Sequence, residues 1–206
     1  MAKIDFYFDF LSPYSYLASL RLRRLRAEFG AEIIFHVIDL AAAKEAIGNT
    51  RPPFHLLPSK LRYLKADLAR WATRYDAPLV FPETLAHVDL KAAARLNRGF
   101  LCAARRGAGE AYLNAAFAAL WAAQREPGDA TLRDVAAKAA LDPAQIAAAA
   151  DAPETIADYA RENLEAQARG VFGVPTFIAG DQLFWGNDRL DFLEEYLREP
   201  QAAVHP

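Results

Sequence analysis

The sequence is poor in the residues that redox chemistry and metal binding use most. Cys102 is its only cysteine, which excludes both an internal disulfide and a cluster of thiolate metal ligands. The histidines beyond residue 36, at positions 55, 87 and 205, show no metal-ligand spacing. We therefore predict no metal site. We expect Cys102 to be a buried helix thiol and His36 to be a core histidine.

The sequence also lacks a basic excess and a long apolar run. Its formal net charge is -2, whereas a dedicated nucleic-acid binder carries an excess of lysine and arginine. The longest apolar run, residues 115–123, is far shorter than the roughly 20 residues of a membrane helix. Residues 1–5 contain no apolar signal core. We expect a cytoplasmic protein that binds neither nucleic acid nor a membrane.

Apolar periodicity at the start of the chain predicts a β-α-β unit. Residues 3–10 alternate between apolar and polar side chains and include several aromatics, which is typical of a strand. A helical pattern begins at Tyr14 and closes at Gly30. Residues 32–40 form a second apolar run. Because the connection is too long for a hairpin, we expect the two strands to be parallel.

The middle of the sequence is helical. Residues 41–58 are rich in glycine and proline and predict a loop, whereas residues 59–169 are rich in alanine, leucine and arginine. Asp142 followed by Pro143 predicts a helix start. Thr131 with Asp134 resembles a capping box. The helical block is cut by prolines 78, 82, 127, 143 and 153.

Strand chemistry returns after Gly170. Residues 176–178 and 182–185 flank a turn and predict a β-hairpin, which a last helix follows. With the helical block removed, the order of elements is that of a thioredoxin fold. With 53% hydrophobic residues, disorder is excluded. We predict an α/β protein with a thioredoxin-like domain (1–41 and 170–206) and a helical insertion with its connecting loop (42–169).

The turn between the first strand and the first helix contains Ser12 and Ser15. A serine before a helix commonly caps it, which contributes about 1 kcal/mol. The same turn is where α/β folds place reactive or anionic groups, and where thioredoxin-like redox proteins carry C-x-x-C. Here serines occupy both cysteine positions, which excludes thiol–disulfide exchange by the protein itself. A serine hydroxyl can still donate a hydrogen bond to a ligand thiolate.

Pro175 precedes the first strand of the predicted hairpin. One interpretation is a plain turn. In a thioredoxin fold, however, this position holds a cis proline that faces the C-x-x-C turn. Val174 then presents an unpaired backbone amide and carbonyl, to which a peptide-like ligand can bind as an antiparallel strand.

Two other segments combine amide and charged side chains. Asn187 and Asp188 either cap the last helix or bind a ligand, since free amides at a helix N-terminus bind a carboxylate and Asp188 can hold an ammonium group. The segment from Asn49 to Lys60 is either a surface connection or a source of a cation and an amide above the β-α-β unit.

Taken in order along the chain, these segments resemble one family. The sequence is similar to the glutathione-dependent 2-hydroxychromene-2-carboxylate isomerases, relatives of kappa-class glutathione transferases in the DsbA-like thioredoxin superfamily, over residues 3–198. The resemblance is carried by FYFDFLSPYSYLA (6–18), NTRPPFHLLPSK (49–60), GVFGVPTF (170–177) and FWGNDRL (184–190).

The resemblance assigns roles to individual residues. Ser12 matches the serine that contacts the glutathione sulfur, with Ser15 in support. Val174, before Pro175, matches the residue that pairs with the cysteinyl backbone. Asn187 and Asp188 match the pair that holds the γ-glutamyl end, although kappa transferases commonly have Ser-Asp there. Asn49 and Lys60 match residues that contact glutathione and substrate. Tyr14 and Trp185 are assigned to the aromatic substrate pocket.

The resemblance also implies an activity. It implies a homodimer that uses glutathione as a cofactor and interconverts 2-hydroxychromene-2-carboxylate with trans-o-hydroxybenzylidenepyruvate, a small aromatic carboxylate, in naphthalene or related aromatic catabolism. One alternative is a kappa-type transferase that conjugates electrophiles. Another is a non-catalytic thioredoxin-like module that binds peptides. The sequence does not separate these functions.

Overall fold

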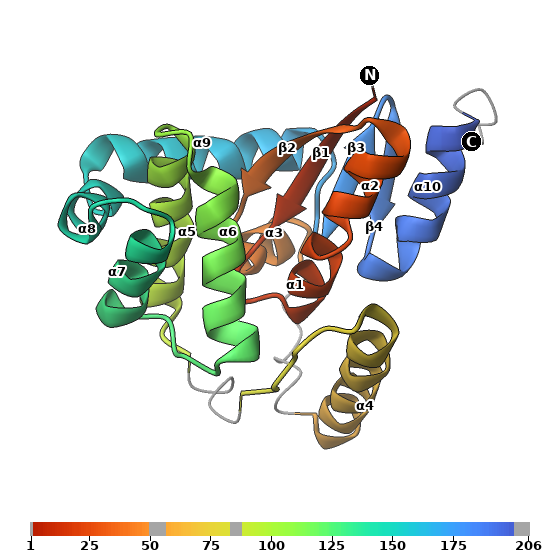
Figure 1. Ribbon diagram of the computed structural model, residues 1–206, viewed down its shortest axis with the longest axis horizontal. Coiled ribbons are helices and arrows are strands. Elements are labelled where there is room, and N and C mark those ends of the chain that lie inside the picture. The colour runs from red at the N-terminus through yellow and green to blue at the C-terminus, as the bar shows by residue number, and fades with distance from the viewer. Residues whose placement is uncertain (1, 50–56, 83–87, 200–206) are drawn as a thin grey trace.

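The computed structural model describes residues 2–49, 57–82 and 88–199. A mixed sheet lies at the centre of the thioredoxin-like half (Figure 1), with strand order β2-β1-β3-β4. β1 (Lys3–Phe8) pairs in parallel with β2 (Glu32–Val37). It pairs antiparallel with β3 (Thr176–Ala179), and β3 pairs antiparallel with β4 (Gln182–Trp185). The parallel β-α-β unit and the C-terminal hairpin are both confirmed.

The first two strands end earlier than the sequence pattern predicts, because aspartates turn the chain. After β1, the Asp9 carboxylate accepts a hydrogen bond from the Leu11 amide at 2.8 Å. After β2, Asp39 caps α3 (Leu40–Ala46) by accepting from the Ala41 and Ala42 amides at 2.9 and 3.1 Å. The prediction of an uninterrupted loop over residues 41–58 is therefore wrong in its first third. An aspartate followed by an alanine-rich run was the missed signal.

The first helix is divided in two, although the sequence predicts one helix up to Gly30. α1 (Pro13–Ser19) is followed by α2 (Leu22–Phe29). At the break, the Ser19 hydroxyl donates to the Tyr16 carbonyl at 2.7 Å, a local bond that competes with the helical pattern. Gly30 ends α2 in the left-handed conformation with φ of 59°, as predicted.

The helical block is confirmed, and three of its helices begin with a proline in the first turn. Asp142 caps the helix that starts at Pro143, as predicted. The predicted capping box is wrong, because the Thr131 hydroxyl lies inside a helix and donates to the Glu126 carbonyl at 2.7 Å. The helices are α4 (Pro58–Tyr75), α5 (Leu90–Ala104), α6 (Gly109–Phe117), the π-helical η3 (Ala118–Ala122), α7 (Asp129–Lys138), α8 (Pro143–Ala150) and α9 (Pro153–Ala168).

Each face of the sheet packs against helices. On one face, Phe6 and Phe8 join a large core that reaches Phe100 and Phe117 in the helical block. The opposite face is smaller and is covered by α3 and α9. After β4 the chain forms the short 3-10 helix η4 (Asn187–Arg189) and then α10 (Leu190–Arg198). In Figure 1, α5 to α8 form one end of the molecule and α4 lies below α1.

Within the helical block, Cys102 is buried in α5, as predicted. In the part of the chain that the structure describes, no helix is both long and apolar enough to cross a membrane. The same residues contain no group of three histidine, cysteine or carboxylate side chains that could hold a metal ion. The division into domains at residues 41/42 and 169/170 stays a prediction.

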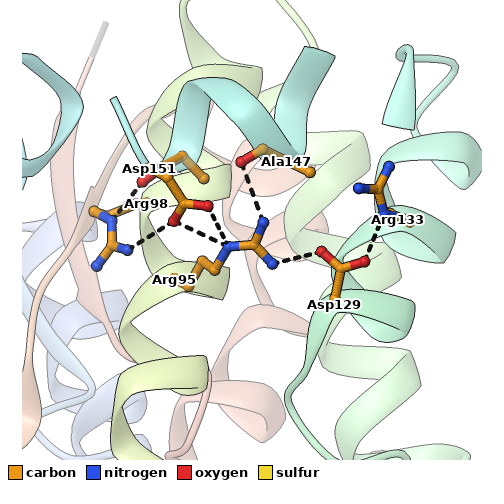
Figure 2. A network of polar contacts seen from close by, with 7 residues as sticks. Arg95, Arg98, Asp129, Arg133, Ala147 and Asp151 are labelled. Atoms are coloured by element: carbon orange, nitrogen blue, oxygen red, sulfur yellow. Dashed lines mark hydrogen bonds and ion pairs between the residues drawn. The ribbon is translucent and has the colours of Figure 1, made fainter. Parts of the chain in front are cut away.

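Arg95 joins three helices of the block (Figure 2). Its guanidinium donates to both Asp151 oxygens at 2.9–3.0 Å and to Asp129 at 2.7 Å. It also donates to the Ala147 carbonyl in the last turn of α8 at 3.3 Å. Arg98 supports the same helix end by donating to the Ala150 carbonyl at 2.6 Å. These bonds satisfy carbonyls that have no partner within α8.

We expect Arg95→Met to lower the free energy of unfolding by about 1–2 kcal/mol, because a partly exposed ion-pair network contributes less than a buried one. Urea denaturation measures this. The control is Arg161→Met, which removes an exposed arginine whose partners lie on its own helix, α9. We expect that control to change stability by about 0.5 kcal/mol or less. Equal losses in the two variants would contradict the assignment.

On the smaller sheet face, His36 lies between two carboxylates. Its Nε2 lies 2.9 Å from Asp5 Oδ1, and its Nδ1 lies 3.3 Å from Glu162 Oε2. Tyr7 stacks on the imidazole, and Arg169 at the end of α9 donates to Tyr7 and Asp5. Burial acts to lower the pKa of His36, but Glu162 and Asp5 outweigh it and raise that pKa. Both ring nitrogens of His36 therefore have partners, but the prediction of a core histidine is wrong, because the side chain is only partly buried at the margin of this sheet face.

This arrangement makes stability depend on pH. Because the pKa of folded His36 lies above the unfolded value of about 6.5, its stabilisation is complete below that pH. It is lost as the pH rises through the folded pKa. Urea denaturation between about pH 6 and about pH 9 should show this decline in the wild type and a flatter profile in His36→Gln. Parallel profiles would show that His36 does not cause this dependence of stability on pH.

Candidate functional site

The turn after β1 places Ser12 at the N-terminus of α1. Ser12 is the N-cap, and its Oγ accepts from the Ser15 amide at 3.1 Å. The capping interpretation is therefore confirmed. Ser12 is only 3% exposed, and its own hydroxyl proton has no acceptor among the described residues. A ligand atom bound there would be shielded from water and could accept that proton.

Ser15 lies in the first turn of α1 and is completely buried. Its hydroxyl has no hydrogen-bond partner in the described part of the chain, while its amide is used by Ser12. Ser15 therefore supports Ser12 through its backbone.

The pairing of β1 with β3 brings Val174 close to the Ser12 turn. Tyr7 lies opposite Thr176, so the residues that follow β1 and those that precede β3 meet at one edge of the sheet. The peptide bond between Val174 and Pro175 is cis, as predicted. The Pro175 carbonyl accepts from the Gly186 amide at 2.8 Å, whereas neither backbone group of Val174 has a partner among the described residues. Val174 can therefore pair with an extended ligand.

Asn187 lies in η4, which packs against α1. It is 3% exposed, and its Nδ2 is buried without a partner in the described residues. The expectation that Asn187 or Asp188 caps the last helix is wrong, because neither side chain makes a capping hydrogen bond. A buried amide without a partner is costly and is satisfied when a ligand accepts from it. Asp188 is exposed and pairs with Arg189 at 3.2 Å.

Tyr14 connects α1 to α4. Its hydroxyl donates to Asp67 Oδ2 at 2.7 Å. Burial, followed by this carboxylate, raises the pKa of Tyr14 well above its usual value, so the phenol stays neutral. Lys60 is exposed seven residues before Asp67 in α4. Two helical turns separate them, or about 10 Å along the axis, so both side chains lie on the same side of α4.

Trp185 ends β4 beside the loop that contains Val174. Its indole is 52% exposed and meets the Phe172 ring edge-to-face, with 4.9 Å between centroids. A side chain at Gly173 would collide with this indole. An aromatic surface therefore lies next to the backbone of Val174, and the role of Trp185 in a substrate pocket stays a prediction.

In the described structure, Asn49 makes no hydrogen bond to any other predicted site residue. It is exposed, and its backbone amide donates to the Lys44 carbonyl at the end of α3 at 2.9 Å. The rest of the predicted contact loop, residues 50–56, lies outside the described residues.

Sequence reasoning missed two residues that α4 contributes, Asp67 and Tyr75. Asp67 binds Tyr14, and the Tyr75 hydroxyl donates to the Asn187 carbonyl at 3.4 Å. The signal for Asp67 was present, since it is the single acidic residue in a helix with five basic ones. The role of Tyr75 had no signal, because its partner is a backbone atom more than a hundred residues away.

Comparison with known proteins places this geometry in a family. The DSBA-like thioredoxin domain matches residues 3–198. A 2-hydroxychromene-2-carboxylate isomerase of Sphingobium xenophagum is 40% identical over 195 residues, which cover 94% of this chain and 97% of that protein. One of Pseudomonas putida is 42% identical over 192 residues, or 93% and 92% of the two chains. The chain belongs to the 2-hydroxychromene-2-carboxylate isomerase family, within the DsbA-like thioredoxins.

Solved structures agree with membership of this isomerase family. The structure of a 2-hydroxychromene-2-carboxylate isomerase superposes with a TM-score of 0.87 at 40% identity, covering 96% of this chain and 95% of that one. The cytosolic disulfide reductase DsbM of Pseudomonas aeruginosa, solved with GSH, shares the fold with a TM-score of 0.61 at 20% identity, over 95% and 99% of the two chains. Glutathione S-transferase kappa 1 of Caenorhabditis elegans is 39% identical over 83 residues, or 40% and 36% of the chains.

We expect Tyr14→Phe to loosen the attachment of α4 to α1. The variant loses a hydrogen bond to a charged acceptor, which contributes about 1.5–3 kcal/mol when well shielded. Amide hydrogen exchange in residues 58–75 should quicken by about tenfold or more. Tyr63→Phe is the matched control, because Tyr63 is a largely exposed tyrosine of the same helix. Unchanged exchange in Tyr14→Phe would show that this bond does not attach α4.

Proposed function

We propose that this protein is a glutathione-dependent isomerase that interconverts 2-hydroxychromene-2-carboxylate and trans-o-hydroxybenzylidenepyruvate. The observation that carries the proposal is the Ser12 hydroxyl at the start of α1, with its proton free, in a chain that closely resembles proteins named for this reaction. Serine cannot form a disulfide, so the position suits an isomerisation, in which no net oxidation or reduction occurs.

Three groups would fit glutathione, and none has a partner among the described residues: the Ser12 hydroxyl proton, the Val174 backbone and the Asn187 Nδ2. The Ser12 hydroxyl would donate to the sulfur, and the Val174 backbone would pair with the cysteinyl residue. The buried Nδ2 of Asn187 would donate to the γ-glutamyl carboxylate, and Asp188 would hold its ammonium group. Relatives whose names include glutathione or GSH support this assignment.

A hydrogen bond from Ser12 would be strong enough to keep much of the glutathione thiol ionised at neutral pH. A free thiol has a pKa near 8.5, and lowering it by about two units requires roughly 2.7 kcal/mol of thiolate stabilisation. A hydrogen bond to a charged group contributes about 1.5–3 kcal/mol. A helix N-terminus adds about 0.3–2 kcal/mol, and α1, with only two turns, gives the lower part of that range. The Ser12 hydroxyl therefore supplies most of the effect.

When bound, glutathione would supply a thiolate whose reversible addition to the conjugated carbon of the substrate turns the double bond into a single bond, so that the chromene ring can open or close and that bond can rotate before elimination restores the double bond and the thiolate. The chain orients the two molecules. Lys60 would attract the substrate carboxylate as a point charge, and Asn49 would contact the same end. The neutral Tyr14 phenol and the Trp185 indole would border the aromatic ring.

The setting of this reaction is also part of the proposal. From the resemblance we propose a homodimer that acts in the cytoplasm, in the catabolism of naphthalene or related aromatic hydrocarbons. Its partners are then a small aromatic carboxylate and glutathione.

We expect Ser12→Ala to lower kcat for the glutathione-dependent isomerase reaction by roughly 10- to 150-fold, because one hydrogen bond to a thiolate is lost. Ser19→Ala is the matched control. Ser19 is a buried serine of the same helix, and its hydroxyl bonds only a local carbonyl. A Ser12→Ala variant with the wild-type rate at pH 7 would contradict the mechanism.

A kappa-type transferase is the second candidate, and the partial match to the kappa 1 protein favours it over a module without catalysis. It would bind glutathione through the same residues, Ser12, Val174 and Asn187. Product analysis separates the two activities: isomerised substrate with free glutathione recovered in full indicates the isomerase, and a stable thioether indicates the transferase. A peptide-binding module without catalysis would give neither product and no thiolate absorbance from bound glutathione at pH 7.

A further inference from the structure

The turn of residues 9–12 carries Ser12 but belongs to no helix or strand. Two bonds lie within it: the Ser12 amide donates to the Asp9 carbonyl at 3.0 Å, and the Leu11 amide donates to Asp9 Oδ1 at 2.8 Å. Outside the turn, Asp9 Oδ2 accepts from the Leu40 amide at 2.9 Å, and both backbone groups of Phe10 bond to side chains from the helical block. The position of the turn therefore depends on residues about ninety and a hundred and ten positions along the chain.

Asn97 of α5 holds the Phe10 amide. Its Oδ1 accepts from that amide at 3.4 Å, and its Nδ2 donates to the Ile38 carbonyl at 3.2 Å and to the Tyr159 hydroxyl at 2.9 Å. Asn97 is buried, and both hydrogens and the oxygen of its side-chain amide form hydrogen bonds. It fixes the turn relative to the end of β2 and to α9.

Trp121 binds the carbonyl of Phe10, whose amide Asn97 binds. Its Nε1 donates to the Phe10 carbonyl at 2.8 Å, and the whole side chain is buried. Trp121 lies in η3, where the chain changes from an α-helix to a π-helix. A π-helical turn is rare and is found frequently at functional sites. The indole that bonds the Ser12 turn lies within this unusual segment.

We infer that Trp121 and Asn97 are positioning residues for the reaction: they fix Phe10 from both sides and thereby hold the Ser12 hydroxyl in place. The inference rests on the proposed function, in which that hydroxyl stabilises a thiolate. A hydrogen bond of this kind weakens steeply with distance and misalignment. A turn that moves by a fraction of an ångström therefore costs activity even when the fold is intact.

The test removes the indole N–H, and one of its two variants also keeps the bicyclic ring. In one variant Trp121 is replaced by 3-benzothienylalanine, which has sulfur in place of the N–H group, and in another by phenylalanine. We expect kcat with glutathione and 2-hydroxychromene-2-carboxylate to fall about 3- to 10-fold, with KM changed less than about twofold. The acid limb of the kcat profile should move to higher pH, because a displaced Ser12 stabilises the thiolate less.

The matched control is Tyr112→Phe. The Tyr112 hydroxyl donates to the Leu96 carbonyl at 3.1 Å in the same helical core, and Tyr112 is as deeply buried as Trp121. Its ring lies beside Phe10, with 6.1 Å between centroids, and the variant keeps that ring while it removes a hydroxyl that does not bond to the turn. We expect this variant to lose some stability and to keep the wild-type kcat and pH profile. If Tyr112→Phe shows the same kinetic changes as the Trp121 variants, the effect is general destabilisation and the inference is overturned.

A second measurement needs neither glutathione nor substrate. Amide hydrogen exchange at Ser12 and Ser15, whose amides bond to Asp9 and to Ser12, should quicken in the Trp121 variants and stay unchanged in Tyr112→Phe. Wild-type exchange and kinetics in the benzothienylalanine variant would overturn the inference. If the wild-type protein has no isomerase activity, the proposed function fails, and hydrogen exchange alone decides whether Trp121 holds the turn.

Discussion

The antiparallel pairing of β1 with β3 is the constraint on which the rest of the site depends. Tyr7 opposite Thr176 places the end of one strand beside the start of the other. The Ser12 turn and Val174, more than 160 residues apart in sequence, thus lie at one edge of the sheet. A shift of the register by one residue would reverse the side-chain faces and separate the two. The aromatic core of Phe6, Phe8 and Phe177 makes such a shift costly.

The helical block has two functions in this arrangement. Its own packing is secured by Arg95 and its partners, which join α5, α7 and α8 (Figure 2). Its contacts to the thioredoxin-like half, through Asn97, Trp121 and the helix α9, hold the turn and the second sheet face. The insertion is therefore part of the support of the site as well as an addition to the fold.

The site contains several polar groups that the folded chain leaves without partners in the described residues: the Ser12 proton, the Val174 backbone and the Asn187 amide. Buried polar groups of this kind normally find partners. In the proposed function, each of the three would bind a different part of glutathione. The chemistry of the proposed reaction follows from the replacement of redox cysteines by serines, which leaves a hydrogen-bond donor and removes the electron-transfer group.

The sequence by itself determined the order of elements, the helical block, the buried Cys102, the cap at Ser12 and the cis bond before Pro175. Strand periodicity, helix propensity and the motifs of the family resemblance can all be read from residues that are neighbours in the sequence. Its local patterns did not reveal α3, the break after Ser19 or the free side chain of Asn187. Only the tertiary structure decided that Asp67 binds Tyr14 and that Trp121 bonds Phe10. Such bonds join distant positions, and their geometry follows from packing, which no local pattern encodes.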